Sequence, residues 1–339
     1  MPKISAEPVV DYKRHCLNGP TMGTRWSASF YAESTIDFGA LHLDLSAAVH
    51  EVDEQMSPWK PNSDLMRLNR APVDDWVDLS SEILEVLDCA LDIRRLSAAA
   101  FDPYVGALVD AWGFGSVRDK PDAQAIRSAH KSTPSGEHEC LELDRPAGRA
   151  RKCATLQLDL CGITKGYAVD RMVKVLQQHR VRHALAALDG ELCGLGSKAT
   201  GLPWDVAIER PEFGHRAVHG VIELEDLAIA SSGDYRHYLE VGGVRIAHTM
   251  DSRRGGPVNN AVASVTVLAH TCMVADAWAT AFLVAGPEEG LAMANRMEME
   301  VLFLLRNDEG LMELGTGRFS RCTDRSNLAS KKNTLVAKP

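Results

Sequence analysis

The sequence predicts a fold of the α+β class, in which runs of strands are flanked by separate helices. Short stretches of alternating apolar residues follow one another through the middle of the chain with no helical pattern between them. Amphipathic helical patterns stand before and after that run, and hydrophobic residues make up 45% of the chain, enough to fill a core. Because helices and strands do not alternate, we expect mixed or antiparallel sheets with flanking helices, not a doubly wound sheet.

The N-terminal half is expected to hold one strand and three helices. The predicted elements are a flexible arm at 1–18, a strand at 21–32, helices at 41–56 and 81–95, and a short helix at 122–130 within a polar excursion at 116–150. Ser57-Pro58 ends the first helix, because proline cannot continue it. Ser80 or Ser81 caps the second.

The C-terminal half is expected to hold most of the strands. The predicted elements are a strand at 156–160, a helix opening at Lys165, strands at 181–188, 204–209, 219–224, 227–231, 243–249 and 264–269, helices at 273–285 and 288–297, a strand at 299–305 and a polar tail at 318–339. A hairpin is predicted to run through 194–201 into the strand at 204–209. The chain shows no internal repeat.

Composition limits the classes of partner. The formal charge is −9, from 46 acidic and 37 basic residues, and the basic residues are scattered, so nucleic-acid binding is not expected. Eight cysteines form no CxxC pair, which favours reduced thiols. The most apolar run, 273–285, is interrupted by Asp276 and too short to span a bilayer. No signal peptide is seen. We therefore expect a cytoplasmic protein, or a periplasmic one if the natural N-terminus is missing.

Residues 158–170, LDLCGITKGYAVD, read as a strand end, a turn at Gly162 and a helix opened by Lys165-Gly166. Such a turn directs backbone N–H groups, the positive end of a helix dipole and one lysine toward the same point, which suits a phosphate. An ordinary strand-to-helix turn with a solvated lysine fits the same residues. The spacing is not that of a Walker loop. The stretch therefore indicates an anion site without naming the ligand.

Asp276 and Thr280 stand four residues apart, on one face of an otherwise apolar helix. A carboxylate and a hydroxyl in this arrangement are either satisfied core groups or oxygen ligands for a hard cation such as Mg²⁺. Spacing alone favours the first interpretation.

His248 lies at a strand end, three residues before Asp251 and a glycine-rich loop. A lone histidine is usually structural, but this one could act as a general base beside Asp251. With an ordinary pKa it would lose that role below about pH 6. Ser232, in the turn that follows a strand, is either a ligand contact or a turn cap.

Glycine and aromatic residues mark three further segments. Met22-Gly23 suggests either a close backbone approach or a bulge, and Trp59 at a helix exit suits either a core or a stacking surface. Asp102 lies between Phe101 and a proline, at the start of a glycine-punctuated apolar run. The apolar side chains of that run contact either a ligand or only the hydrophobic core.

Taken together, these pieces resemble the ApbE family of FAD:protein FMN transferases. The motifs that recur in the family's order are Met22-Gly23-Thr24, Met56-Ser57, Phe101-Asp102, Val105-Gly106, Trp112-Gly113-Phe114-Gly115, Asp159-Leu160, Lys165-Gly166-Tyr167, Ser232-Gly233-Asp234-Tyr235, His248 with Asp251 and Gly256-Pro257, and Asp276-Ala277 with Ala279-Thr280-Ala281. The resemblance covers about residues 20 to 305.

The resemblance implies a single α+β unit of the T-fold-like ApbE kind, here at 19–317. It also implies a reaction in which FMN moves from FAD onto a threonine of a target flavoprotein, with Mg²⁺ present and AMP released. The Mg²⁺ ligands it implies are the carbonyl of Thr164 and the side chains of Asp276 and Thr280. His248 matches the proposed base. The flavin contacts it implies are Met22, Trp59, Ala100, Phe101, Asp102, Cys161, Lys165, Tyr167, Ser232 and Met250.

Three departures from the family pattern matter. Asp189-Gly190-Glu191 stands where members usually have Gly-Gly-Glu, and Thr164 where they have Ala or Ser. Many members carry an export signal, which is not seen here. The chain also lacks an acceptor sequence of the type Asp-x-x-(Ser/Gly)-(Ala/Ser)-Thr, so it is expected to be the donor enzyme.

Two other functions fit the same residues: storage of FAD without transfer, and Mg²⁺-dependent hydrolysis of FAD to FMN and AMP. A base at His248 favours transfer, because storage needs none. A homodimer is left open.

Overall fold

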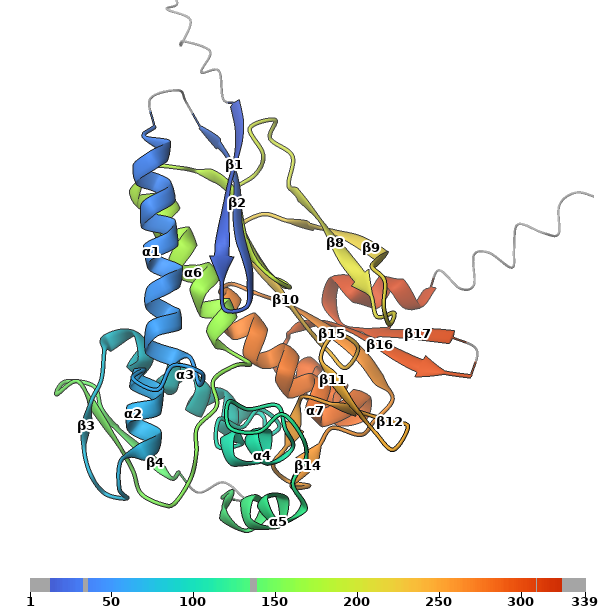
Figure 1. The fold of residues 1–339 in the computed structure, drawn as a ribbon. Coiled ribbons are helices and arrows are strands. Elements are labelled where there is room, and N and C mark those ends of the chain that lie inside the picture. The colour runs from blue at the N-terminus through green and yellow to red at the C-terminus, as the bar shows by residue number, and fades with distance from the viewer. Residues whose placement is uncertain (1–12, 33–35, 135–138, 309, 325–339) are drawn as a thin grey trace, which may run out of the picture.

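The centre of the molecule is one antiparallel sheet of eight strands (Figure 1). A computed structural model describes residues 13–32, 36–134, 139–308 and 310–324. The strands, in their order across the sheet, are β1 (Lys13–Thr21), β2 (Thr24–Ala32), β6 (His183–Leu188), β7 (Glu191–Leu195), β10 (Leu227–Gly233), β15 (Val262–Ala269), β16 (Glu300–Asn307) and β17 (Gly310–Gly315). Every neighbouring pair in this sheet is antiparallel.

Three long helices cover one face of the sheet. They are α1 (Phe38–Met56), α6 (Thr164–Gln178) and α7 (Cys272–Arg296). Figure 1 shows α1 beside α6, and α6 beside α7, which lies against β10 and β15. Inside α7, Gly286 has φ 79° and Pro287 follows it. The helix kinks there because proline removes a backbone donor and left-handed φ favours glycine.

The other face of the sheet is covered by a hairpin and the C-terminal turn. The elements are β8 (Trp204–Arg210), β9 (Ala217–Leu224) and the 3₁₀ helix η1 (Gly317–Asp324). Strand residues alternate between the two cores: Val265 and Val267 of β15 face the helices, while Leu268 faces the hairpin. Burial on both faces explains why β15 and β16 read as almost continuous apolar runs.

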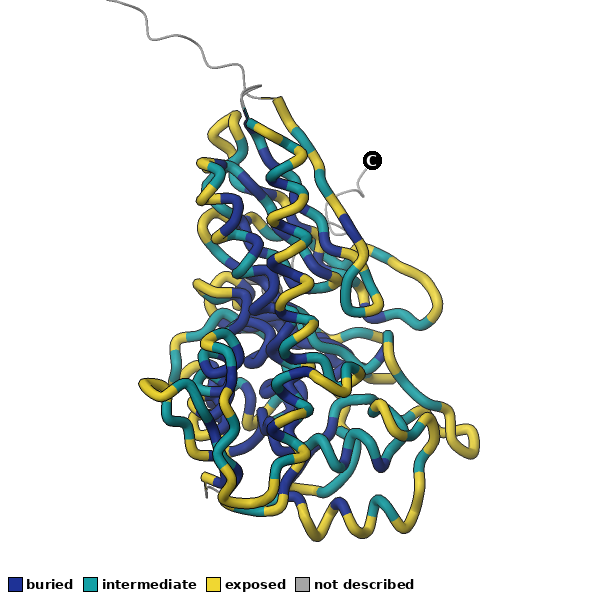
Figure 2. Tube along the Cα trace, turned by 60° about the vertical axis from the view of Figure 1, so that its left-hand side comes forward, coloured by how far each residue is buried: buried dark blue, intermediate teal, exposed yellow. Residues whose placement is uncertain are grey.

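The remaining elements lie around the end of the helical layer shown at the bottom of Figure 1. They are α2 (Asp64–Arg70), β3 (Val77–Asp78), α3 (Ser81–Leu96), α4 (Gly106–Ala111), α5 (Ala123–Ser132), β4 (Leu141–Asp144) and β5 (Arg149–Lys152), with two short hairpins, β11 (Tyr238–Val241) with β12 (Val244–Ala247) and β13 (Met250–Asp251) with β14 (Gly256–Pro257). Buried residues run continuously through the interior, and exposed residues lie on the outer turns (Figure 2).

The predicted α+β class is confirmed, as are the helices at 41–56, 81–95 and 122–130, with boundaries shifted by a few residues. Ser80 is the N-cap residue of α3, although its side chain makes no capping hydrogen bond. The one-domain assignment of 19–317 stays a prediction.

Several strand predictions were wrong. Of the strand expected at 21–32, residues 24–32 are confirmed as β2, but Met22-Gly23 form the turn of a hairpin with β1. The expected strand at 156–160 has only an isolated bridge between Val105 and Gln157. Leu156, Leu158 and Leu160 are buried in alternation, so the pattern recorded burial and not sheet pairing. The strand at 204–209 pairs with β9, not with 194–201. The strand expected at 243–249 is confirmed as β12, which pairs with β11.

Both chain ends were also predicted incorrectly where the structure describes them. Residues 13–18, assigned to a flexible arm, belong to β1, and residues 1–12 lie outside the described part. Residues 318–324, assigned to a polar tail, belong to η1, whose Phe319 is buried against the sheet. A single buried aromatic among polar residues is too weak a pattern to predict this contact. Residues 325–339 lie outside the described part.

Candidate active site

The site begins where the N-terminal ends of α6 and α7 meet. The backbone N–H of Gly166 donates to Oδ2 of Asp276 at 2.9 Å. A Cβ at Gly166 would lie 2.2 Å from the carbonyl oxygen of Cys272, so only glycine allows the two helices to approach this closely. The predicted turn at Lys165-Gly166 therefore opens a helix, and its glycine is needed for the contact with α7.

A second carboxylate makes the reciprocal contact. Asp170 of α6 accepts hydrogen bonds from the backbone N–H groups of Cys272 and Met273, at 2.8 and 2.9 Å. Each helix thus supplies a carboxylate to the N-terminal turn of the other, where the helix dipole favours negative charge. Burial nevertheless raises the pKa of Asp170 to about 6 and also raises the pKa of Asp276. Asp170 does not stand out in the sequence as a site residue, because its partners lie about a hundred residues away.

A lysine and two further carboxylates lie at this junction. Lys165 Nζ is 2.7 Å from Glu191 Oε1 and 3.7 Å from Asp189 Oδ2. Burial opposes the lysine charge, but Glu191 and Asp276 outweigh it and raise the pKa of Lys165. For Glu191, which is 1% exposed, burial disfavours the charged carboxylate and therefore raises the pKa. Lys165 is therefore not the solvated lysine of the simplest interpretation.

Asp189 explains one departure from the family pattern. Its φ is 54°, in the left-handed region where glycine is most at ease and aspartate is tolerated. Its Oδ1 accepts a hydrogen bond of 2.8 Å from Arg236, which also pairs with Glu209. The aspartate thus ties the β6–β7 turn to β8, a contact that glycine cannot make.

Thr280 lies next to the central turn. The Thr280 Oγ1 is 3.1 Å from Ser232 Oγ. A Cβ built on Gly162 would lie 3.0 Å from this Thr280 oxygen. Phe101 borders the same point, 3.4 Å from that Cβ position. The structure therefore brings together predicted site residues from β10, α7, the central turn and the segment before α4.

The oxygen atoms at this junction fit a hard cation. No described residue donates a hydrogen bond to Oδ1 of Asp276, a side chain that is 2% exposed. The hydroxyl of Thr280 is one turn along the helix, and Thr164, whose carbonyl is the third predicted ligand, begins α6 between Gly162 and Gly166. Carboxylate, hydroxyl and carbonyl oxygens are ligands that Mg²⁺ accepts. Over the described residues, no cluster of three or more His, Cys, Asp or Glu forms a metal site, so these three residues stay a prediction.

The segment before α4 is held in an unusual conformation. Ala98 and Ala99 have φ of 50° and 59°, and Phe101 N–H donates to Ser97 Oγ at 3.1 Å. Two left-handed alanines in succession cost about 1 kcal/mol each or more. The segment places Ala100 and Phe101, both buried, beside the central turn. They stay predicted flavin contacts.

Asp102 has a structural partner. Its Oδ1 accepts hydrogen bonds from Arg94 Nε and from the backbone N–H of Tyr104, both at 3.0 Å. Arg94 also stacks on the Tyr104 ring, 4.6 Å from its centroid. This buried ion pair fixes the segment that carries Phe101. We therefore assign Asp102 first to positioning, and its flavin contact stays a prediction.

His248 was predicted to work beside Asp251, but the structure gives the two residues different partners. His248 Nδ1 is 3.0 Å from the carbonyl oxygen of His237, whereas Asp251 accepts hydrogen bonds from Arg253. Burial, with the positive charges of His237 and Lys165, lowers the pKa of His248 to about 4. The lowered pKa moves the expected loss of the base from near pH 6 toward about pH 4. Its Nδ1 partner leaves Nε2 as the nitrogen available to a substrate.

The remaining predicted flavin contacts divide into two groups. Met22 is half-buried in the β1–β2 turn, Trp59 is 59% exposed and Cys161 is exposed, so these three are accessible. Tyr167 and Met250 are buried. Tyr167 donates from its hydroxyl to Glu85 at 2.9 Å, and Met250 packs with Leu108 and Ala129. These last two therefore lie in the core, and their flavin contact stays a prediction.

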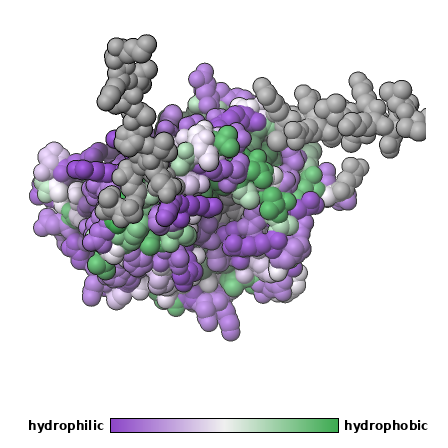
Figure 3. Space-filling model, turned by 90° about the horizontal axis from the view of Figure 1, so that it is seen from above, coloured by the Kyte–Doolittle hydropathy of each residue, from purple (hydrophilic) through white to green (hydrophobic). Residues whose placement is uncertain are grey.

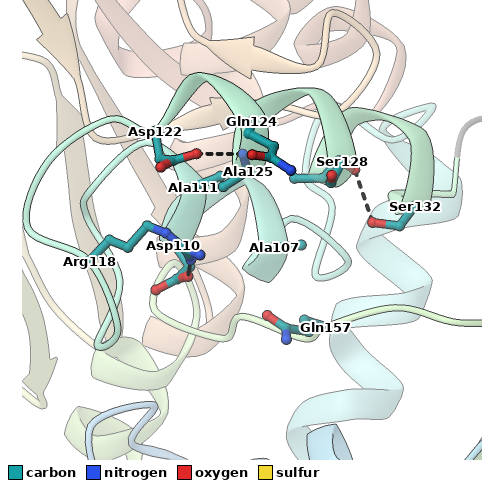
Figure 4. Close-up of a pocket in the computed structure, with 11 residues that line it drawn as sticks. Ala107, Asp110, Ala111, Arg118, Asp122, Gln124, Ala125, Ser128, Ser132 and Gln157 are labelled. Carbon is teal, nitrogen blue, oxygen red and sulfur yellow. Dashed lines mark hydrogen bonds and ion pairs between the residues drawn. The ribbon is translucent and has the colours of Figure 1, made fainter.

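A cavity of about 450 Å³ between α4 and α5 is a separate feature (Figure 4). Its charged lining residues already have partners: Asp110 pairs with Arg118, and Asp122 caps α5. None of the predicted site residues lines it. We do not assign the chemistry to this cavity.

Comparisons with known proteins match these observations. A sequence profile of the ApbE family matches residues 22–303. The chain is 35% identical over 307 residues to an FAD:protein FMN transferase of Vibrio cholerae, covering 89% of this chain and 91% of that protein. It is 32% identical over 317 residues to one of Haemophilus influenzae, with 91% of each covered.

Solved structures agree with the sequence comparisons. The flavin transferase ApbE of Vibrio cholerae superposes with a TM-score of 0.82 at 34% identity, over 91% of this chain and 99% of that one. The apo form of the Pseudomonas stutzeri flavinyl transferase ApbE also gives 0.82, at 31% identity, over 93% of this chain and 99% of that one.

Proposed function

Because the chain belongs to the ApbE family, we propose that it is an FAD:protein FMN transferase. In the proposed reaction the hydroxyl of a threonine on a target flavoprotein attacks the phosphorus of the FMN half of FAD. The pyrophosphate P–O bond to the AMP half breaks, a phosphoester forms on the threonine, and AMP leaves. The threonine proton passes to a base.

The observation that carries the proposal is the meeting of the Asp276 carboxylate, the Thr280 hydroxyl and the central turn at the crossing of α6 and α7. Asp276, Thr280 and the Thr164 carbonyl would hold Mg²⁺, which when bound neutralises charge on the pyrophosphate. Lys165 adds a fixed positive charge at the same junction. The reciprocal contacts of α6 and α7 keep these groups in place, so little reorganisation is needed on binding.

His248 gives the reason to prefer transfer over storage. Its neutral imidazole can accept the threonine proton at Nε2 over a wide pH range, because its pKa is lowered to about 4. An FAD-storage protein needs no such group. Hydrolysis, with water in place of threonine, uses the same metal and base and is the second candidate function.

One experiment separates the three functions. The protein is incubated with FAD, Mg²⁺ and a peptide of about fifteen residues containing Asp-Leu-Leu-Ser-Ala-Thr, and the peptide is weighed by mass spectrometry. We expect the peptide to gain one FMN and AMP to appear in equal amount. Free FMN with AMP and an unchanged peptide would indicate a hydrolase. Binding of FAD with no AMP would indicate storage.

A direct titration tests the first step. We expect flavin fluorescence to be quenched at FAD concentrations of tens of micromolar, an affinity of roughly −6 kcal/mol. An absence of quenching over that range would remove the flavin function altogether.

Location and assembly stay open in the proposal. Of the helices in the described part of the chain, none has the length and apolar character needed to cross a bilayer. A cytoplasmic location and a homodimer both stay predictions, and the target is identified only by its chemistry, a flavoprotein with an accessible threonine.

A further inference from the structure

The hairpin of β11 and β12 leads directly to His248. Gly242 and Gly243 form its two-residue turn, with φ of 58° and 79°, which suits a type I′ turn and fixes the strand register. His237 immediately precedes β11 and His248 immediately follows β12. The hydrogen bond from the His248 ring to the His237 carbonyl closes the base of the hairpin.

One face of this hairpin is polar and covered. Residues directly opposite each other on paired strands share a face, so Glu240 and Arg245 lie on one side with Tyr238. Arg245 pairs with Glu240 at 3.3 Å and stacks on Phe213, 3.9 Å from its centroid. Phe213 also contacts the Tyr238 ring edge-on. The loop between β8 and β9 therefore covers this side.

The opposite face is entirely aliphatic. Leu239 pairs with Ile246, and Val241 pairs with Val244, which places these four side chains together. Val241 is 42% exposed and Val244 is 64% exposed. None of the four belongs to a buried cluster of the described residues. On the side of the molecule seen in Figure 3, most of the surface is hydrophilic and apolar residues form small groups.

The aliphatic face continues to the proposed base. His237 and His248 flank the two strands at the base of the hairpin, each two residues along the chain from one of the inner aliphatic pair, Leu239 and Ile246. The two imidazole rings are 5.6 Å apart, as cross-strand neighbours would be. If a polypeptide packs on this face, the residues that follow the packed segment would therefore lie close to His248.

We propose that the aliphatic face of the β11–β12 hairpin, formed by Leu239, Val241, Val244 and Ile246, is the docking surface for the target flavoprotein. Its occupant is the segment around the acceptor threonine, whose own aliphatic side chains pack on the face while the threonine hydroxyl reaches His248. This inference rests on the proposed transfer function and adds to it the site and the chemistry of acceptor recognition.

The size of the face fits this occupant better than a second copy of the chain. Four aliphatic side chains offer at most a few hundred Å², the range of ordinary surface patches. A stable dimer buries about 1,200 Å² or more in total. A transient enzyme–target contact can be smaller, and fast release of the modified product requires a weak contact. Because Glu240 and Arg245 neutralise each other, the contact should also depend little on salt.

The test compares two pairs of exposed valines. The double variant Val241→Ser/Val244→Ser removes the aliphatic tip of the docking surface. The matched control Val218→Ser/Val221→Ser changes two valines of β9, which are 64% and 65% exposed, on a different hairpin. Both variants are assayed for FMN transfer to the peptide of about fifteen residues that contains Asp-Leu-Leu-Ser-Ala-Thr, and to the same peptide with serines in place of the two leucines.

We expect the Val241/Val244 variant to raise KM for the leucine peptide by about 10- to 100-fold, with kcat changed less than about threefold and FAD affinity unchanged. The control should behave as wild type. For the serine peptide, wild type and variant should have the same raised KM, because the contact is already lost. The variant Val241→Ile/Val244→Ile should keep the wild-type KM.

Each other outcome overturns the inference in a distinct way. An unchanged KM, or an equal rise in the Val218/Val221 control, would exclude the hairpin as the docking surface. Loss of FAD affinity would assign the face to the flavin, and a fall in molecular mass by light scattering would assign it to a second copy. If the wild-type protein transfers FMN to neither peptide and releases no AMP, the proposed transferase function itself fails. This outcome is distinct from failure of the docking proposal, in which the wild type still transfers FMN.

Discussion

The two halves of the candidate site are built in opposite ways. At the α6–α7 junction, Asp276 and Asp170 are each fixed by backbone N–H groups of the other helix, and Gly166 has no room for even one more carbon. The His248 half is the base of a two-stranded hairpin with an exposed tip. One half is locked by buried contacts between two long helices, and the other is a hairpin closed at its base by one local hydrogen bond and covered on one face by Phe213.

The difference matches what the proposed reaction demands of each half. Holding a metal and a pyrophosphate requires oxygen atoms at fixed positions, because small displacements cost rate. Receiving a protein partner requires an accessible surface that can accept and release it. We therefore expect changes at the junction to affect both stability and turnover, and changes at the hairpin to affect turnover or acceptor binding alone.

The largest effect is expected at Asp276. Asp276→Asn keeps an oxygen for the Gly166 N–H but removes the charge that would hold Mg²⁺, so transfer should fall by about a thousandfold or more. Asp276→Ala should do the same and also lose about 1 to 3 kcal/mol of unfolding free energy. Rates are measured across a Mg²⁺ titration, alongside urea unfolding.

A matched control for this change is Asp226→Asn, since Asp226 also accepts a hydrogen bond from a glycine N–H, that of Gly196 at 2.7 Å, outside the site. It should keep full activity. An Asp276→Asn enzyme that retains its Mg²⁺-dependent rate would reduce Asp276 to a helix-terminus contact.

The next effect is expected at His248. His248→Asn should slow transfer by about a hundred- to ten-thousandfold, because threonine is a poor nucleophile without a base. FAD affinity should stay within a few-fold. With its pKa lowered to about 4, the wild-type imidazole is neutral above that value, so the acid limb of the rate profile should lie near pH 4 and not near pH 6. Steady-state rates from pH 4 to 8 and FAD titrations test both statements.

A limb near pH 6 would mean that His248 titrates as an exposed imidazole. Equal rates for wild type and His248→Asn would remove it from the mechanism, and a parallel loss of FAD affinity would make it a ligand contact.

Gly166→Ala tests how tightly the junction is locked. The added Cβ would lie 2.2 Å from the Cys272 carbonyl oxygen and 2.8 Å from Asp276 Cβ, so α6 and α7 must separate. We expect a loss of about 1 to 3 kcal/mol of unfolding free energy, even though alanine favours helix, together with weaker Mg²⁺ activation.

Gly220→Ala is the control, since a Cβ there meets nothing within 4 Å. It should change stability by less than about 0.5 kcal/mol. Similar unfolding curves for the two variants would show that the helices have room to adjust.

The smallest effect on turnover is expected from Asp170→Asn, which should change mainly how stability depends on pH. Burial raises the folded pKa of Asp170 to about 6, above the value near 3.9 of an unfolded chain. The raised pKa favours the folded state fully below about pH 4, and this advantage is lost as pH rises through 6. Between pH 4 and 7, wild type should therefore lose about 2 to 3 kcal/mol of unfolding free energy relative to Asp170→Asn.

Urea unfolding of both proteins at several pH values gives this difference directly. If the unfolding free energy of wild type instead rises relative to that of the variant as pH rises, the ionised carboxylate stabilises the N-terminus of α7 by more than its burial costs.

The sequence by itself determined the α+β class, the long helices and most strands of the sheet. These follow from local periodicity, because a side chain's burial repeats every 3.6 residues in a helix and every two in a strand. It also supplied candidate members of the site, since Gly162, Lys165, Asp276 and Thr280 stand out by residue type against apolar surroundings. The hairpin at Met22-Gly23 was missed because its first strand, β1, is mostly polar and exposed and was therefore read as part of a flexible arm.

Only the tertiary structure decided what these residues touch. The reciprocal contacts of Asp170 and Asp276, the Glu191 partner of Lys165 and the separation of His248 from Asp251 all join segments distant in sequence or depend on how a loop turns. The same holds for the pKa of His248, which burial lowers, and for the aliphatic face of the β11–β12 hairpin. A sequence gives the chemistry of each side chain, but its partner, burial and electrostatic environment are set by packing between elements, which local patterns do not encode.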